Sequence, residues 1–249
     1  MNARRPSAIL LGLAVVLSAC TRQLTEPPVP QPPATPTSSA PTKPAILLPT
    51  PKPTDVVKSQ TFADVPVDHP YYLQIEALWR HGFTSGCKAD PPMFCPEATM
   101  NRAEGVVFIE RGIWGSQFMP GAPTTQVFSD LPADDWAAKW ATALWLDGYT
   151  SGCSAEPLNF CPLRGYTRAE GTVFYLRMMY GRDFLPPDAQ GVFGDVPREY
   201  WAASWVEAAT KVGLIPPCQA EPPLFCPDAP LTRAMAAFML VQAKGIPLE

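Results

Sequence analysis

The chain has 249 residues and a formal net charge of −4, from 19 basic and 23 acidic side chains. This balance argues against a nucleic-acid-binding protein, because such proteins need a basic face for the phosphates. An anionic ligand would have to be held by a few well-placed arginines rather than by the field of the whole protein.

The first 19 residues are typical of an export signal. A basic pair, Arg4-Arg5, precedes an apolar stretch (residues 9–17) and two small residues. The stretch is too short for a membrane-spanning helix. Leu17-Ser-Ala-Cys20 resembles the lipobox of bacterial lipoproteins, which implies an extracytoplasmic, membrane-anchored protein whose mature chain begins at a lipidated Cys20. The alternative is an ordinary cleaved signal in which Cys20 has no such role.

Residues 20–61 are predicted to form a linker. Eleven of the 29 residues in 26–54 are proline, mixed with threonine, serine and alanine, and this composition cannot form a packed core. A semi-extended chain rises roughly 3.1 Å per residue, so the segment could span about 90 Å. Residues 62–249 are long enough to form a well-buried domain.

One pattern occurs three times in residues 62–249. Each copy opens with Phe-x-Asp and continues to a glycine at the same position of the repeat and a Cys-x7-Cys element. It closes with Arg-Ala before a second helical stretch. The copies are 66 and 65 residues apart. Such a fixed period indicates one structural unit used repeatedly. The predicted repeats are residues 62–127, 128–192 and 193–249.

The first helix of each repeat is predicted where apolar residues recur at helical spacing. A glycine follows each of these stretches, in the position where a left-handed residue ends a helix. The predicted helices cover residues 71–81, 137–147 and 202–212.

The second helix of each repeat is predicted to begin at the Arg-Ala signature. In the first two repeats, Asn101 or Thr167 precedes it and a glutamate stands three residues later, which forms a capping box. Met235 replaces that glutamate in the third repeat. A basic residue in the first turn is unfavourable against the helix dipole. Folding alone therefore does not explain the three signature arginines, and we expect a role in ligand binding for Arg102, Arg168 and Arg233.

The cysteines indicate disulfides. With Cys20 assigned to lipid, the other six cysteines fall into three equally spaced pairs in an exported protein, where disulfides can form. Zinc is the alternative, but the spacing is wrong for a zinc site and each pair has no second pair beside it. We therefore expect no metal, and the predicted disulfides are Cys87–Cys95, Cys153–Cys161 and Cys218–Cys226.

The predicted fold class is mainly α. A two-helix unit with one apolar face cannot bury that face alone, whereas three units in series can pack around a common axis. We expect three helix–loop–helix repeats in an intramolecular pseudo-threefold bundle, in a monomeric protein.

The elements of each unit together resemble the S-layer homology (SLH) repeat. They are Phe-x-Asp-Val, a tryptophan-bearing helix ending in glycine, a loop with an aromatic-x-Pro element, and Thr-Arg-Ala-Glu. The loop elements are Phe94-Cys-Pro96, Phe160-Cys-Pro162 and Phe225-Cys-Pro227. The resemblance covers almost all of residues 62–249. It implies a pseudo-trimer with a central helix bundle, which binds acidic, often pyruvylated, cell-wall polysaccharides non-covalently in grooves between repeats.

Site residues follow from this resemblance by position. Arg102 and Arg168 would pair with an acidic sugar substituent, since a planar guanidinium binds a carboxylate through two hydrogen bonds. Arg233 also matches, but Met235 breaks its motif. The opening aspartates could accept hydrogen bonds from sugar hydroxyls, and capping or turn formation is their alternative role. These aspartates are Asp64, Asp130 and Asp195.

The family's groove also includes a loop before the first cysteine of each pair. Thr84-Ser-Gly86 and Thr150-Ser-Gly152 match it, whereas the third repeat has Ile215-Pro-Pro217. We therefore expect two intact sites, with glycan contacts at Gly86 and Gly152, and one degraded site. Four tryptophans could stack on sugars or belong to the core: Trp79, Trp136, Trp145 and Trp201.

Three functions compete. The first is a non-catalytic tether without a cofactor, attached to a membrane by lipid and to wall glycan by its repeats. The second is an interaction module that binds another envelope protein. The third is a glycan hydrolase that uses paired carboxylates such as Asp64 and Glu104. No such pair differs from its copies in the other repeats, and there is no nucleophile elbow, so we do not expect an enzyme.

Overall fold

The computed structural model describes residues 60–249, so the signal peptide, Cys20 and the linker up to residue 59 lie outside the described residues. Within this range the protein is mainly helical, as predicted. Each short first helix is one residue shorter at both ends than expected from the sequence. The helices are α1 (Tyr72–Arg80), α2 (Arg102–Trp114), α3 (Ala138–Leu146), α4 (Arg168–Tyr180), α5 (Ala203–Lys211) and α6 (Arg233–Lys244). The strands form two antiparallel pairs, β1 (Lys88–Ala89) with β2 (Pro92–Met93) and β3 (Ser154–Ala155) with β4 (Leu158–Asn159).

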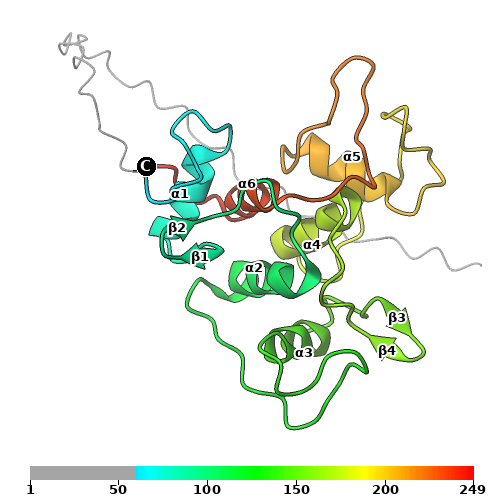
Figure 1. Ribbon diagram of the computed structural model, residues 1–249. Coiled ribbons are helices and arrows are strands. Elements are labelled where there is room, and N and C mark those ends of the chain that lie inside the picture. Colours follow the sequence, from blue (N-terminus) through cyan, green and yellow to red (C-terminus); the bar gives the residue numbers. More distant parts are fainter. Residues whose placement is uncertain (1–59) are drawn as a thin grey trace, which may run out of the picture. The chain divides into compact units, whose positions relative to one another are not determined.

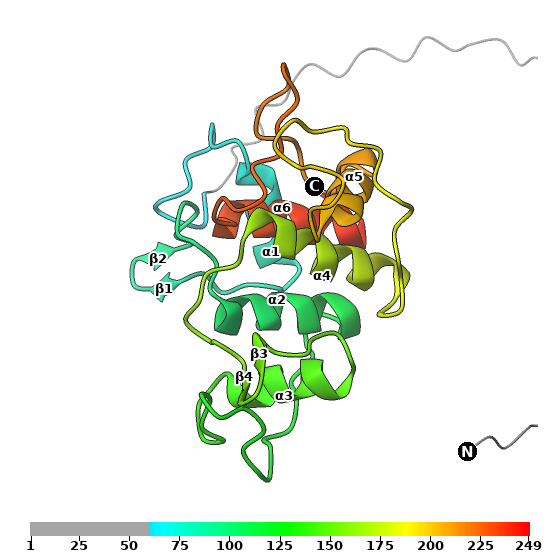
Figure 2. The ribbon, with the colours of Figure 1, turned by 90° about the vertical axis from the view of Figure 1, so that its right-hand side faces the viewer.

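The three longer helices, α2, α4 and α6, contact one another at the centre of the domain (Figures 1 and 2). The shorter helices lie outside them, with α3 on α2, α5 on α4 and α1 on α6. Each short helix therefore packs on the long helix of the preceding repeat. Because α1 has no preceding repeat, it packs on the last helix of the chain, and the arrangement closes on itself.

Small residues in the central helices leave room for the side chain that precedes the next central helix. A Cβ atom added to Gly105 of α2 would lie 2.2 Å from a ring carbon of Tyr166, and one added to Gly171 of α4 would lie 3.0 Å from Leu231. The equivalent position in α6 is Ala236, which is buried. A larger side chain at Gly105 would therefore displace Tyr166 from the core.

A closed set of three backbone hydrogen bonds lies before the central helices. The Met100 N–H donates to the Leu231 carbonyl, the Leu231 N–H to the Tyr166 carbonyl, and the Tyr166 N–H to the Met100 carbonyl, each at 2.9 Å. One residue of each repeat thus serves as both donor and acceptor. The set is complete only when all three repeats are present.

The starts of the central helices are capped in two ways. The predicted capping boxes are confirmed at Asn101 with Glu104 and at Thr167 with Glu170, whereas Thr232 caps α6 alone. The first two helical N–H groups bond to carbonyls of the next repeat, as in the bond from the Arg102 N–H to the Arg164 carbonyl (2.9 Å). These N–H groups have no partner within their own helix, so each helix start depends on the neighbouring repeat.

No helix in residues 60–249 has both the length and the apolar composition needed to span a bilayer.

One central helix carries a buried acid. Glu110 of α2 is fully buried, and neither of its carboxylate oxygens has a hydrogen-bond partner of ordinary geometry among the described residues. The equivalent residues of α4 and α6 are Leu176 and Val241. Burial, and secondly the negative charge of Asp147, raise the pKa of Glu110 from 4.5 to about 8, although the Trp114 indole opposes this shift.

We predict that Glu110→Leu stabilises the protein at neutral pH. Folded Glu110 keeps a proton that the unfolded chain releases above pH 4.5, so its contribution becomes more unfavourable as pH rises from about 4.5 to 8. The gain in unfolding free energy should therefore grow over this range. Urea denaturation from pH 4 to pH 9 measures it, with Glu110→Gln as a control that removes the titration but keeps a buried polar group. A gain that does not change with pH would contradict the prediction.

Candidate functional site

The three signature arginines join neighbouring repeats. In each, the side-chain Nε donates a hydrogen bond of 2.7–2.9 Å to the backbone carbonyl of a phenylalanine in the next repeat, and the third repeat reaches back to the first. The guanidinium also lies over the ring of the same phenylalanine, 4.8–5.1 Å from its centroid. We call this contact the arginine–phenylalanine bridge. The bridges are Arg102–Phe160, Arg168–Phe225 and Arg233–Phe94.

These bridges correct the argument that folding alone does not explain the arginines. A hydrogen bond from a charged group stabilises a protein by about 1.5–3 kcal/mol, and a cation–π contact adds about 0.5–2 kcal/mol. Together they outweigh the unfavourable position at a helix start, which costs about 0.3–1 kcal/mol. All three arginines are buried. Their repetition is therefore explained by folding, and a ligand-binding role needs a separate observation.

The outer nitrogens of the three guanidinium groups differ in their surroundings. Arg168 Nη2 donates to the Pro216 carbonyl at 2.7 Å, and Arg233 Nη1 forms an ion pair with Glu104 at 3.6 Å. Burial lowers the pKa of both arginines. Arg102 Nη2 is buried and has no hydrogen-bond partner among residues 60–249. Of the three arginines, Arg102 alone has a buried outer nitrogen without a hydrogen-bond partner in residues 60–249.

Each arginine faces a loop of the next repeat. Arg168, whose own motif is intact, meets the altered loop Ile215-Pro-Pro217, and Pro216 occupies its outer nitrogen. Arg233 lies at the helix start that has lost its glutamate and meets the first repeat. Arg102 combines an intact helix start with the intact loop Thr150-Ser-Gly152. Arg102 and Arg168 are therefore not equivalent in their surroundings, and the expectation of two intact sites stays a prediction.

Arg102 lines a cavity of about 300 Å³, which we call the Arg102 groove. This volume lies in the range of small-ligand sites. All three repeats contribute to it, since Arg102 comes from the first, residues 149–153 and the start of α4 from the second, and Trp201 from the third. Trp201 is 59% exposed, so its ring is available to a ligand.

The lining of the Arg102 groove is positively charged although the protein is acidic. Three arginines (Arg102, Arg164 and Arg177) line it, against one carboxylate, Glu170, which forms an ion pair with Arg164. Arg177 Nε is buried and, like Arg102 Nη2, has no partner among the described residues. The groove therefore offers hydrogen-bond donors and positive charge to an anion.

The two loop glycines have a structural role. Gly86 and Gly152 have positive φ angles of 89° and 85°, and an added Cβ would lie 2.3–2.4 Å from the carbonyl oxygen of Met93 or Asn159. Each glycine therefore allows its loop to approach the second strand of its repeat. Gly152 also lines the Arg102 groove. A glycan contact at Gly86 stays a prediction.

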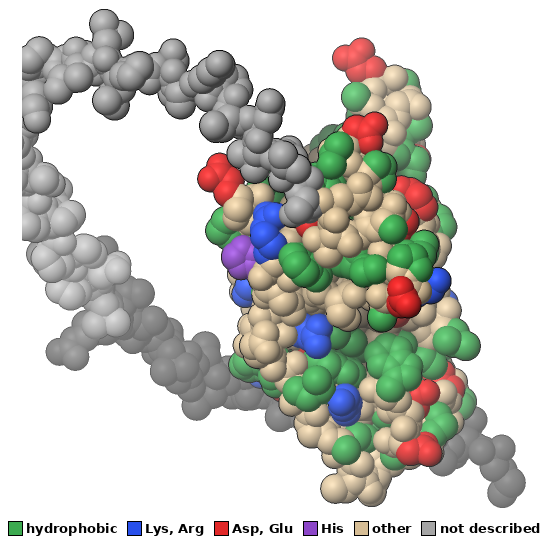
Figure 3. Space-filling view, turned by 60° about the vertical axis from the view of Figure 1, so that its left-hand side comes forward, with side chains coloured by type: hydrophobic (Ala, Val, Ile, Leu, Met, Phe, Trp, Pro, Cys, Tyr) green, Lys and Arg blue, Asp and Glu red, His purple; other side chains and the backbone are tan. Residues whose placement is uncertain are grey.

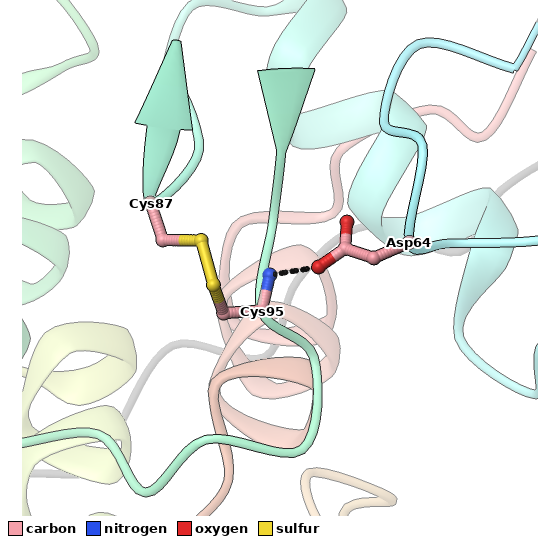
Figure 4. Close-up of side chains that lie close together, drawn as sticks. All are labelled: Asp64, Cys87 and Cys95. Atoms are coloured by element: carbon pink, nitrogen blue, oxygen red, sulfur yellow. Dashed lines mark hydrogen bonds between the residues drawn. A yellow bond between two sulfur atoms is a disulfide. The ribbon is translucent and has the colours of Figure 1, made fainter. Parts of the chain in front are cut away.

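The opening aspartates hold the cysteine loops. Asp64 Oδ1 accepts a hydrogen bond from the Phe94 N–H at 2.8 Å, and Oδ2 accepts one from the Cys95 N–H at 2.7 Å (Figure 4). Asp130 and Asp195 make the same two contacts in their repeats. The N–H groups lie 30 or 31 residues further along the chain, so the carboxylates hold a distant loop rather than a local cap or turn. A contact of these aspartates with a sugar stays a prediction.

The predicted disulfides are confirmed in all three repeats. Each lies beside its aspartate, so that one carboxylate and two sulfurs come within 4.8 Å of one another (Figure 4). A metal would need thiolates, and the two sulfurs are bonded to each other instead. Two carboxylates were considered for hydrolysis. Asp64 accepts the two loop hydrogen bonds given above, and Glu104 accepts a hydrogen bond from the Asn101 N–H and forms an ion pair with Arg233.

No protein-family model matches the chain, and no curated protein matches it.

We predict that Asp130→Ala destabilises the protein by about 2–4 kcal/mol, because two charge-assisted hydrogen bonds to the loop are lost. Urea denaturation measures the change. The exposed Asp134, four residues later, is the matched control, and Asp134→Ala should change the free energy of unfolding by less than about 0.5 kcal/mol. Equal effects of the two substitutions would show that the carboxylate of Asp130 does not hold the loop.

Proposed function

We propose that this protein is a non-catalytic anchor of the bacterial cell envelope, and that its Arg102 groove binds an acidic cell-wall glycopolymer. The observation that carries the proposal is Arg102, whose charged side chain lines the groove and whose buried Nη2 has no hydrogen-bond partner among the described residues. Leaving such a group unsatisfied costs about 1–3 kcal/mol or more. A carboxylate oxygen of a ligand would remove this cost.

The charges around the groove favour an anionic ligand of small size. Arg102, Arg164 and Arg177 provide three guanidinium groups, and Glu170 already neutralises one of them. On the face shown in Figure 3, basic and acidic side chains are interspersed with hydrophobic ones. Because the protein as a whole is acidic, the attraction for an anion comes from these few guanidinium groups rather than from the field of the whole protein. A guanidinium binds a carboxylate with well-defined geometry.

The other groove residues suit a sugar. The exposed Trp201 offers a ring face, on which the apolar face of a pyranose can stack. Thr150 and Ser151 add hydroxyl groups to the lining, and Gly152 adds backbone. An acidic substituent on a sugar would contact the arginines while the ring contacts the indole. This combination matches the ligand class that the resemblance to S-layer homology repeats implies.

The proposed anchoring role combines this groove with the N-terminal segment. We propose that lipid on Cys20 holds the protein at a membrane and that the proline-rich linker spans the distance to the wall. Both features rest on the sequence, since they lie outside the described residues. The proposed protein is a monomer in which three SLH-type repeats replace three subunits.

We predict that Arg102→Ala abolishes glycan binding and that Arg168→Ala does not. Both substitutions remove an arginine–phenylalanine bridge, a hydrogen bond together with a ring contact, so both should lower the free energy of unfolding by about 2–5 kcal/mol. Arg168 Nη2 is already occupied by Pro216, so its loss should leave affinity within about twofold. Isothermal titration with solubilised wall polysaccharide compares them. Equal affinities in the two variants would refute the assignment of the groove to Arg102.

We predict that the charge of the glycan is essential. Carbodiimide amidation of the polysaccharide carboxylates removes the charge and keeps the sugars, and affinity should fall at least tenfold, about 1.4 kcal/mol. Mock-treated polysaccharide is the control. Unchanged binding to the amidated glycan would exclude recognition of a carboxylate. Retention by a protein partner, with none by protein-free glycan, would instead support the interaction module.

A further inference from the structure

A second cavity, of about 700 Å³, lies between α4, α5 and the segment that joins them. We call it the α4–α5 cavity. It shares no lining residue with the Arg102 groove. Its most buried lining residues are Leu176 and Phe193, and much of the remaining lining is apolar, including Tyr180, Phe184 and Val212. Water in contact with this much apolar surface is unfavourable by about 25 cal/mol per Å², so an apolar ligand would be stabilised there.

The cavity exists because one repeat lacks a ring that another repeat has. Helix α3 packs on α2 as α5 packs on α4. In the α2–α3 pair, Trp145 packs edge-on against Phe128, with 6.4 Å between the ring centroids. The equivalent residues of the third repeat are Thr210 and Phe193, and both line the cavity. A threonine in place of the tryptophan leaves the space beside Phe193 open.

A second difference concerns a hydrogen bond that joins α2 and α3 and has no counterpart between α4 and α5. The Trp114 indole N–H at the end of α2 donates to Asp147 Oδ2 just after α3, at 3.1 Å. The equivalent residues are Tyr180 and Val212. A valine side chain accepts no hydrogen bond, so this contact cannot form across the α4–α5 cavity. Both residues line the cavity instead.

The wall of the α4–α5 cavity is nevertheless held in place. The Glu207 carboxylate accepts hydrogen bonds from the backbone N–H groups of residues 190–192, at 2.7–2.9 Å. The Arg198 guanidinium donates two hydrogen bonds to the Gln190 carbonyl, at 2.6 and 3.0 Å. Residues 190–192, which bound the cavity, are therefore held by Glu207 and Arg198. A preformed cavity binds a ligand without first ordering its walls.

The charges of the lining favour an uncharged ligand. Both carboxylate oxygens of Glu207 accept hydrogen bonds from the joining segment. The other charged residues of the lining are Asp188 and Lys211, which have opposite signs. Neither an anion nor a cation would therefore gain from entering the cavity. An aromatic ligand would be stabilised there, since its ring can pack edge-to-face with Phe193, Phe184 and Tyr180.

We propose that the α4–α5 cavity is a binding site for a small uncharged molecule with a planar aromatic ring of about indole size. Its ring would lie beside Phe193, in the place that the Trp145 indole takes beside Phe128 in the second repeat. This site is independent of the glycan proposal, because it uses a different cavity with different chemistry.

Titration of the purified full-length protein with indole tests the proposal. Binding is measured as saturable changes in the amide chemical shifts of ¹H–¹⁵N correlation NMR spectra. We expect a single site with a dissociation constant on the order of 1 mM, as for a small fragment. Thr210→Trp should fill the cavity from within, as Trp145 does in the second repeat, and weaken indole binding at least tenfold without lowering the thermal midpoint. Trp145→Thr is the reciprocal variant and should create a second site.

Three results would overturn the proposal: no saturable shifts with the native protein, undiminished indole binding by a folded Thr210→Trp variant, or equal affinity for the aliphatic probe cyclohexanol. Should Trp145→Thr fail to fold, Thr210→Trp decides alone. Glycan binding by Thr210→Trp should equal that of the native protein. A failure of the α4–α5 site and a failure of the Arg102 groove are thereby distinguished.

Discussion

The contact between an arginine at one helix start and a phenylalanine carbonyl in the next repeat is the constraint on which this fold depends. The first N–H groups of each central helix bond to carbonyls of the same neighbouring segment. No repeat can therefore satisfy its own helix start. Three repeats satisfy one another in turn, and the third returns to the first through Arg233 and Phe94. A truncated chain would leave a buried guanidinium and two N–H groups without acceptors.

Sequence periodicity predicted the elements of this fold but not which elements pair. Apolar spacing, the residues at the helix starts and the cysteine spacing predicted the six helices, the capping boxes and the cysteine pairs, because each depends on residues close together in the chain. It did not show that α1 packs on α6, since a repeat period carries no information about partners. The role of Arg102 was misjudged for the same reason: the helix dipole is local, whereas its acceptor, Phe160, lies 58 residues away.

The candidate site was predicted in part. The sequence identified Arg102, Gly152 and Trp201, but it judged each repeat by its own motif and loop. A groove combines the arginine of one repeat with the loop of the next, so intact sites cannot be counted within single repeats. The contributions of Arg164 and Arg177 were missed, although both stand close to a recognised element, the Phe160-Cys-Pro162 loop and the signature helix. Their position at the groove depends on the pairing of repeats.

The bridge of Arg102 and its proposed contact with a ligand use different parts of one guanidinium group. Nε holds the bridge to Phe160, whereas the buried Nη2 has no hydrogen-bond partner among the described residues. The bridge fixes the guanidinium plane, so the outer nitrogen is oriented before any ligand arrives, which reduces the entropy lost on binding. Because the groove takes residues from all three repeats, it exists only in the closed arrangement. A ligand bound there would in turn stabilise that arrangement over the unfolded chain, and attachment to the wall would then strengthen the domain that makes it.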